Sequence, residues 1–341
     1  MHLMSRFVTV YLLSFTVANG LDTQVVDPPV YRPSLTRQLH TFILQAETSA
    51  LCLVPITSVQ FLNCAPFQEA RSLERPLDYL AILDAHLSWS NAMAIQHTRL
   101  ADTILSMNLL ADSAHMLLLD NRFPHESNLH FSRSLSAVKM KARDIVHSML
   151  IFGSNLEAVL HTMNSVQHIL LRGVEAWSSP ALVSLTRPDT ASMLASIFQI
   201  VAALAEISVV HLDNDVDLLL SSFVSLPTYL SALQKSEPYH ACAARATSKD
   251  ICLDIIAVSV LGLTEAESGL GFVVDVMRGL SEFREVLDRA QIILSGDLDM
   301  RAHIGVESLV ECMGSGVEQM DGYVMKMREV SAQLRRSLSR T

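Results

Sequence analysis

The chain has 341 residues, of which 50% are hydrophobic, and its formal net charge is −10 at pH 7. The apolar half is ample for a sizeable core in one large domain or two modest ones. The acidic balance argues against a nucleic-acid partner, because proteins that bind nucleic acids normally present a basic face.

The first twenty residues have the three parts of a secretory signal. Arg6 and the terminal amine form a positive start, and Phe7 begins an apolar run that is too short to cross a bilayer. Ala18 and Gly20 are the small residues expected before a cleavage site at Leu21. The alternative is a buried N-terminal helix. We expect residues 1–20 to be a signal peptide and the protein to be secreted and extracellular.

Five cysteines follow this segment, and an oxidising compartment favours disulfide bonds. Two pairs are close in sequence, Cys52 with Cys64 and Cys242 with Cys252. Cys312 would then be left over, either buried or available to a partner chain. The sequence does not fix the connectivity. No Cys-x-x-Cys occurs, so neither a zinc ribbon nor a thioredoxin-like site is supported.

Helical spacing dominates the first half of the chain. We expect a helix over about 34–54, a long helix over 76–119 that opens at Pro76, a break at 121–127 and a second long helix over 132–177. Because a short loop joins the two long helices, they should form an antiparallel hairpin.

The second long helix carries the clearest pattern in the sequence. Steps of three and four residues define a heptad seam sustained for five repeats, and every seam position is apolar: Leu135, Val138, Ala142, Ile145, Met149, Phe152, Leu156, Val159, Met163, Val166 and Leu170. Val146 and Leu160 widen the stripe beyond a two-stranded coiled coil, which predicts a bundle of at least three helices.

The preceding helix has a weaker version of this spacing, with polar Ser90, His97, Asn108 and His115 at seam positions. These polar residues predict a curved or broken helix.

The second half of the chain predicts shorter helices. Helices are expected at 189–212, from 213 to an interruption at Pro227, and at 249–263, 270–294 and 300–338. The first of them is apolar nearly all round, which predicts a central position. The acidic cluster 213–217 predicts a helix cap, and 236–248 a loop. Breaks are expected at the glycines Gly269, Gly271, Gly296, Gly314 and Gly316.

Acidic residues are concentrated towards the C-terminus, with fourteen acidic and four basic residues between Asp250 and Asp321. We therefore divide the mature chain into an N-terminal helical part, 21–180, and a C-terminal acidic helical part, 181–341. The two parts are expected to pack as one unit.

Each motif that suggests a metal or catalysis fails on spacing. His125 and His130 are five residues apart, whereas the zinc protease motif needs four. The cluster 213–217 resembles a calcium loop, but Leu218 replaces its glycine and Val224 its glutamate. The pairs Asp112/His115 and Asp144/His147 should lie about 18 Å apart along the hairpin. His147, His161 and His168 should face solvent.

The nucleotide-binding glycine motifs and the Gly-x-Ser-x-Gly motif of hydrolases are absent from the sequence. The sequence thus predicts an all-α multi-helix bundle with a long antiparallel helical hairpin and no cofactor, metal or enzymatic activity. It should be a secreted interaction or structural protein with a protein or other macromolecular partner and no stable membrane span. The alternative is an extracellular carrier of an apolar molecule, a fatty acid or sterol, in a bundle cavity.

The signal pattern predicts that the secreted protein begins at Leu21. Mass spectrometry of the protein recovered from the medium should give the N-terminal peptide that starts at this residue. Recovery of the chain only from the cytosol, with Met1 intact, would show that the segment is not a signal.

Overall fold

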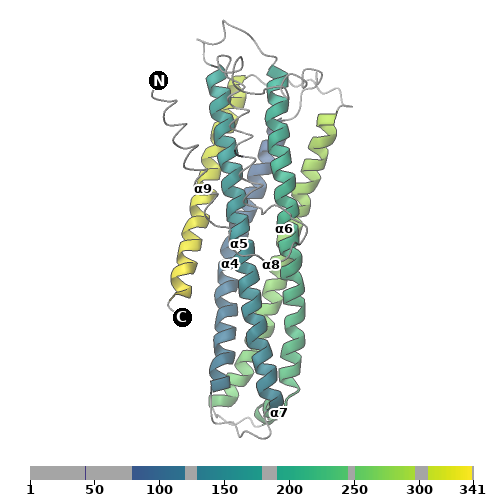
Figure 1. Cartoon of the computed structure of the whole chain (residues 1–341), viewed down its shortest axis with the longest axis vertical. Coiled ribbons are helices and arrows are strands. Elements are labelled where there is room, and N and C mark those ends of the chain that lie inside the picture. The colour runs from purple at the N-terminus through teal and green to yellow at the C-terminus, as the bar shows by residue number, and fades with distance from the viewer. Residues whose placement is uncertain are drawn as a thin grey trace, which may run out of the picture. The chain divides into compact units, whose positions relative to one another are not determined.

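A computed structural model describes Ile43 and residues 79–119, 129–178, 190–244, 250–295 and 306–339. Over these residues the chain forms six helices and no strand, which confirms the all-α class. The helices are α4 (Tyr79–Leu119), α5 (Leu129–Ser178), α6 (Thr190–Gln234), α7 (Glu237–Ala244), α8 (Asp250–Ser295) and α9 (Val306–Leu338), as Figure 1 shows. The helix expected at 34–54 lies outside the described residues apart from Ile43, which is helical and packs against the core.

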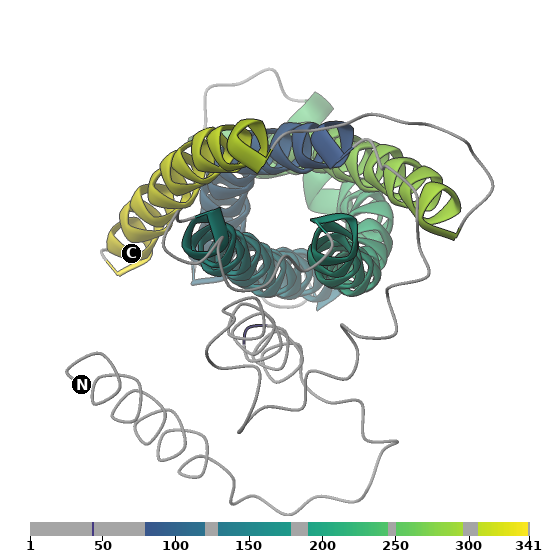
Figure 2. The same cartoon turned by 90° about the horizontal axis from the view of Figure 1, so that it is seen from above.

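Four long helices form a closed ring, in which α4 packs against α5, α5 against α6, α6 against α8, and α8 against α4 (Figure 2). Successive long helices run in opposite directions, so the predicted antiparallel hairpin of α4 and α5 is present (Figure 1). The fifth long helix, α9, packs against α4 and α5 on the outside of this ring.

The heptad seam of α5 lies in the core. All eleven seam residues, from Leu135 to Leu170, are at most 1% exposed. Leu160 is also buried, and Val146 packs partly buried against the same cluster. The stripe is wide because α5 contacts α4, α6 and α9 at once.

Of the two alternatives predicted for α4, curved or broken, the break is absent, because α4 is one uninterrupted helix of 41 residues. The polar side chains at its seam positions do not interrupt it because each has a hydrogen-bonding partner. Those partners are the His86 carbonyl for Ser90, Ser331 for His97, Asp112 for Asn108 and Lys139 for His115.

The prediction of a helix cap at 213–217 was wrong, since these residues lie in the middle of α6. Two of the carboxylates bind side chains of other helices instead: Asp213 pairs with Arg284, and Asp215 accepts a hydrogen bond from Asn155. Pro227 does not end α6 either. Proline removes one helical N–H, but the fully buried side chains around it, Phe223, Leu226 and Leu230, hold the helix in place.

The predicted central position of the segment 189–212 was wrong too. This segment is the first part of α6, which is one member of the ring. Val210, Leu218 and Val224 of α6 are about half or more exposed, at 49%, 63% and 58%. The helix is apolar on both its inner and its outer side.

The glycines expected to break helices lie inside them. α8 continues through Gly269 and Gly271, and α9 through Gly314 and Gly316. At Gly269 a Cβ atom would lie 2.1 Å from the Phe223 ring, so the glycine allows α6 and α8 to approach closely. Gly296 lies outside the described residues.

The predicted loop at 236–248 contains a helix, α7, with Pro238 in its first turn, where proline is tolerated. The predicted pair Cys242 and Cys252 is at disulfide distance, with an S–S separation of 2.14 Å, and joins α7 to α8. Cys312 on α9 is free and partly buried. The predicted pair Cys52 and Cys64 lies outside the described residues.

The helices on both sides of the boundary predicted at 180 pack within one compact unit, Leu35–Thr341. The predicted signal at 1–20 lies outside the described residues. By length and composition alone, two stretches could cross a membrane: Ile200–Gln234 in α6 and Cys252–Asp288 in α8. Within each stretch, the most apolar segment of 18 residues is only partly buried: 33% of it in Ile200–Gln234 and 39% of it in Cys252–Asp288.

Two neighbouring glycines of α8 give a matched test of the close contact with α6. Gly269→Ala should destabilise the fold by about 1–3 kcal/mol, because its methyl group must displace the buried Phe223 ring. Gly271→Ala meets nothing within 4 Å and should stabilise the helix by about 0.5–1 kcal/mol. Urea unfolding measures both. Equal effects of the two substitutions would contradict the close α6–α8 approach.

Candidate functional site

The polar side chains of the described helices gather where α9 lies on α4 and α5. The buried apolar residues of α9 form one narrow stripe with heptad spacing, and each is at most 8% exposed: Met313, Val317, Met320, Val324, Met327 and Leu334. Hydrogen bonds between polar side chains flank this stripe on the side of α5.

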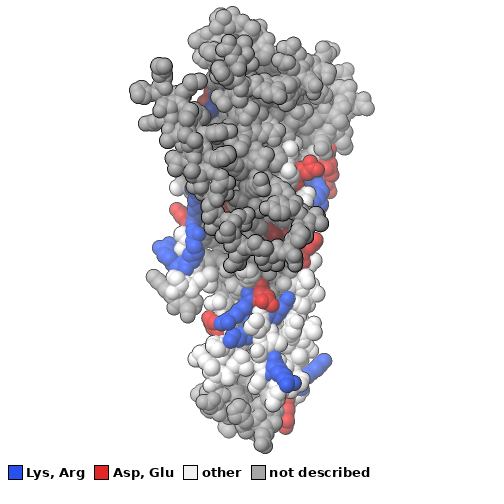
Figure 3. Space-filling view, in the orientation of Figure 1, with Lys and Arg blue, Asp and Glu red and all other residues white. Residues whose placement is uncertain are grey.

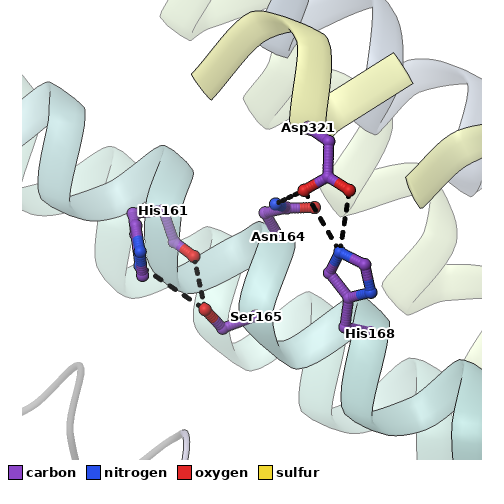
Figure 4. A network of polar contacts seen from close by, with 5 residues as sticks. All are labelled: His161, Asn164, Ser165, His168 and Asp321. Atoms are coloured by element: carbon purple, nitrogen blue, oxygen red, sulfur yellow. Dashed lines mark hydrogen bonds and ion pairs between the residues drawn. The ribbon is translucent and has the colours of Figure 1, made fainter. Parts of the chain in front are cut away.

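Asp321 of α9 is the centre of one such group (Figure 4). Its Oδ1 accepts a hydrogen bond from Asn164 Nδ2 at 2.7 Å, and His168 Nε2 lies 3.2 and 3.1 Å from its two carboxylate oxygens. The hydrogen bond from Asn164, together with the neighbouring His168, lowers the pKa of Asp321. The carboxylate is therefore held in its charged form and connects α9 to α5.

A serine and a second histidine lie one turn away but are not connected to Asp321 (Figure 4). Ser165 Oγ donates to the carbonyl of His161 at 2.9 Å and lies 3.4 Å from His161 Nδ1. In a serine triad, one histidine contacts both the hydroxyl and the acid. Here different histidines contact them, so the group is not arranged as a triad.

A second polar group joins α9 to both neighbours. Ser331 Oγ donates to Glu157 Oε2 at 3.0 Å and lies 3.4 Å from His97 Nε2. His97 is buried, and burial lowers its pKa, while the charge of Glu157 acts in the opposite direction. The Ser331 hydroxyl lies between the base, His97, and the acid, Glu157. The buried Nδ1 of His97 has no hydrogen-bond partner. The order again differs from that of a triad.

A buried cluster of α4, α5 and α8 surrounds His86. Its Nδ1 lies 3.3 Å from Gln167 Nε2, and the Phe283 ring stacks on Trp89 at 4.7 Å and tilts against the His86 ring at 5.2 Å. Two buried nitrogens here, His86 Nε2 and Trp89 Nε1, have no hydrogen-bond partner. Burial lowers the pKa of His86 to about 4, so its ring is neutral at pH 7.

The histidines singled out in the sequence do not converge. His147 and His161 are exposed as predicted, whereas His168 is only partly exposed, with 36% of its side chain accessible, and pairs with Asp321. His115 contacts Lys139, and His130 is exposed at the start of α5. His125 lies outside the described residues. Within the described part of the chain, no group of three or more His, Cys, Asp or Glu could hold a metal ion.

Several acidic residues of the C-terminal part pair with basic residues or histidine. Asp275 of α8 binds Arg99 of α4 at 2.6 Å, and its pKa is lowered first by the hydrogen bond from Arg99. Asp321 likewise pairs with His168. The contacts of α9 were missed from the sequence, because its apolar steps of three and four indicate a buried stripe but not which helix Asp321 contacts.

Comparison of the chain with protein-family models, with curated proteins and with solved structures finds no match.

The buried His86 predicts that the fold loses stability in mild acid. The unfolded chain binds a proton near pH 6.5, whereas the folded chain resists it down to about pH 4. Stability is therefore full above the unfolded pKa and falls as the pH drops towards 4, by about 3 kcal/mol in total. Urea unfolding between pH 4 and 7 measures this slope.

His86→Gln should flatten that slope, because the titrating ring is gone while an amide remains beside Gln167. The matched control is His147→Gln, an exposed histidine of α5, which should leave the slope unchanged. An unchanged slope in His86→Gln would show that other groups cause the acid sensitivity.

Proposed function

We propose that this protein is a non-enzymatic helical interaction protein that binds a macromolecular partner. One observation carries the proposal: within the described residues, the ring of four helices already buries a large set of apolar side chains, and other large apolar side chains remain exposed on the same helices. Such side chains become buried when a partner docks, and exposed apolar surface in groups often indicates binding.

The apolar side chains of the core and those on the outside of the helices differ clearly in their exposed fractions. The core residues of α4, α5, α6 and α8 are mostly 0–2% exposed. On the outside, Met116 of α4 is 67% exposed, Leu218 of α6 63%, and Leu253 of α8 60%. Core packing accounts for the first group but not for the second.

The polar groups support a structural role rather than a reaction. Asp321 and Ser331 each bind side chains of a neighbouring helix, and the hydroxyl, base and acid are not in the order that nucleophilic catalysis needs. These contacts hold α9 on α4 and α5. A protein that presents a rigid helical surface needs such contacts.

The carrier alternative has less support. The described residues line a groove of about 620 Å³ beside Pro227, but it is open to solvent, and its lining includes the imidazole of His130, the amine of Lys235 and the hydroxyls of Thr228 and Ser231. An apolar carrier should instead enclose its ligand among apolar side chains. Secretion and the absence of a membrane span remain predictions.

The test is to isolate the protein from its native source by mild cross-linking and to measure the mass of the product. We expect a discrete complex with one macromolecule. Since charged residues flank the exposed apolar ones, the complex should weaken as salt rises above 0.1 M, where screening acts over about 10 Å. Organic extraction of the same preparation is the control. A monomer that releases a stoichiometric fatty acid or sterol would overturn the proposal in favour of a carrier.

A further inference from the structure

Among the described residues, α9 covers the groove between α4 and α5 along only part of its length, and the remainder is called the uncovered part in that sense. Gly316 faces Leu87 of α4, and fifteen residues later Ser331 faces His97 of α4 and Glu157 of α5. α9 ends at Leu338, two turns farther on, opposite about residue 104 of α4. Figure 1 shows that α4 and α5 continue beyond this end.

The uncovered part of the groove is long enough for a second helix. α4 continues to Leu119, about fifteen residues past the end of α9, which is about 22 Å of helix. α5 flanks it back to Leu129. A helix of about four turns would fit end to end with α9.

The α4 side of this stretch is apolar and exposed. Leu105 follows Leu87 by five helical turns and therefore lies on the flank that contacts α9 farther up. Leu109 and Met116 follow on nearly the same flank. Their exposed fractions are 37%, 57% and 67%. The apolar seat of α9 thus continues past the last residue of α9.

The α5 side combines one apolar residue with a basic edge. Leu150 and Arg143 precede Glu157 by one and two heptads, so they lie on the flank that faces α9. Leu150 lies opposite the last residue of α9, and Arg143 lies beyond it. Leu150 is 38% exposed. Lys139 lies on the same flank, because its Nζ is 2.9 Å from His115 across the groove.

The N-terminal part of α5 is basic, although the protein is acidic. Between Leu129 and Leu150 there are four basic residues, Arg133, Lys139, Lys141 and Arg143, against Asp144 alone. Figure 3 shows Lys and Arg side chains over the lower part of the face in view, with a few Asp and Glu side chains among them. On the α4 side, Asp112 already accepts a hydrogen bond from Asn108.

We propose that this uncovered α4–α5 groove binds an amphipathic helix of a partner protein, with the apolar stripe of that helix on Leu105, Leu109 and Met116 and its acidic edge over Lys139 and Arg143. The inference rests on the proposed function, because it names the surface and the chemistry of the partner. Two features select this occupant: the groove continues the seat of a helix that is already bound, and its charged edge is basic.

The test uses two synthetic helical peptides of about sixteen residues, long enough for the uncovered length. Both have leucines with steps of three and four; one has glutamates along its edge, and the other lysines. Fluorescence anisotropy with the full mature chain should show binding of the glutamate peptide only. Leu109→Glu and Met116→Glu should each weaken it by at least about tenfold, as central contacts do. Lys139→Glu combined with Arg143→Glu should also weaken it.

The control variant is Leu218→Glu, which places the same charge on an equally exposed site of α6. It should bind the peptide like the unaltered protein, and circular dichroism should show that all variants are folded. Binding that survives Leu109→Glu, or equal binding of the lysine peptide, would overturn the proposal. So would concentration-dependent dimers or binding to anionic phosphatidylserine vesicles that Met116→Glu abolishes.

The groove proposal and the proposed function can fail separately. A cross-linked native complex that persists in Met116→Glu would overturn the groove while the proposed function stands. A native monomer with a bound lipid would overturn the proposed function itself.

Discussion

The apolar stripe of α5 contacts α4, α6 and α9 along most of a 50-residue helix. Removing such a stripe from water is the main driving force of folding, and no single neighbour could cover it. Two ring neighbours cover its inner side, and α9 covers the edge that the ring leaves open. The ring and its fifth helix are thus consequences of the width of one stripe, which is why the core side chains of α5 are almost completely buried.

The same stripe explains what the sequence could predict. A period sustained over five heptads is visible without knowledge of the neighbours, so the class of fold and the core residues from Leu135 to Leu170 followed from it. The hairpin followed from the short loop between the two long helices. The polar residues of α4, the glycines of α8 and the acidic cluster of α6 were misread for one shared reason. Each is a poor helix signal locally. The contact that each makes lies within its own helix, as for Ser90, or with another helix, as for Gly269 beside Phe223, and the local pattern shows neither.

The contacts of α9 lay beyond the sequence for a related reason. Asn164 and Asp321 are 157 positions apart, and no periodicity in one helix indicates which polar residue in another will meet it. The acidic C-terminal part looked like a free charged surface. In the structure, Asp275 binds Arg99 and Asp321 binds His168. The count of acidic residues therefore overstated the unpaired negative charge that this part presents to a partner. The basic part of α5 is the less obvious electrostatic feature.

The disulfide between Cys242 and Cys252 closes a loop of only ten positions, at the turn between α6 and α8. Cross-links over such short loops constrain the unfolded chain modestly, by about 3 kcal/mol or less. This bond also connects no two helices of the ring that are distant in sequence. Reduction should therefore loosen α7 and leave the long helices packed, so the described architecture does not depend on the redox state of its surroundings.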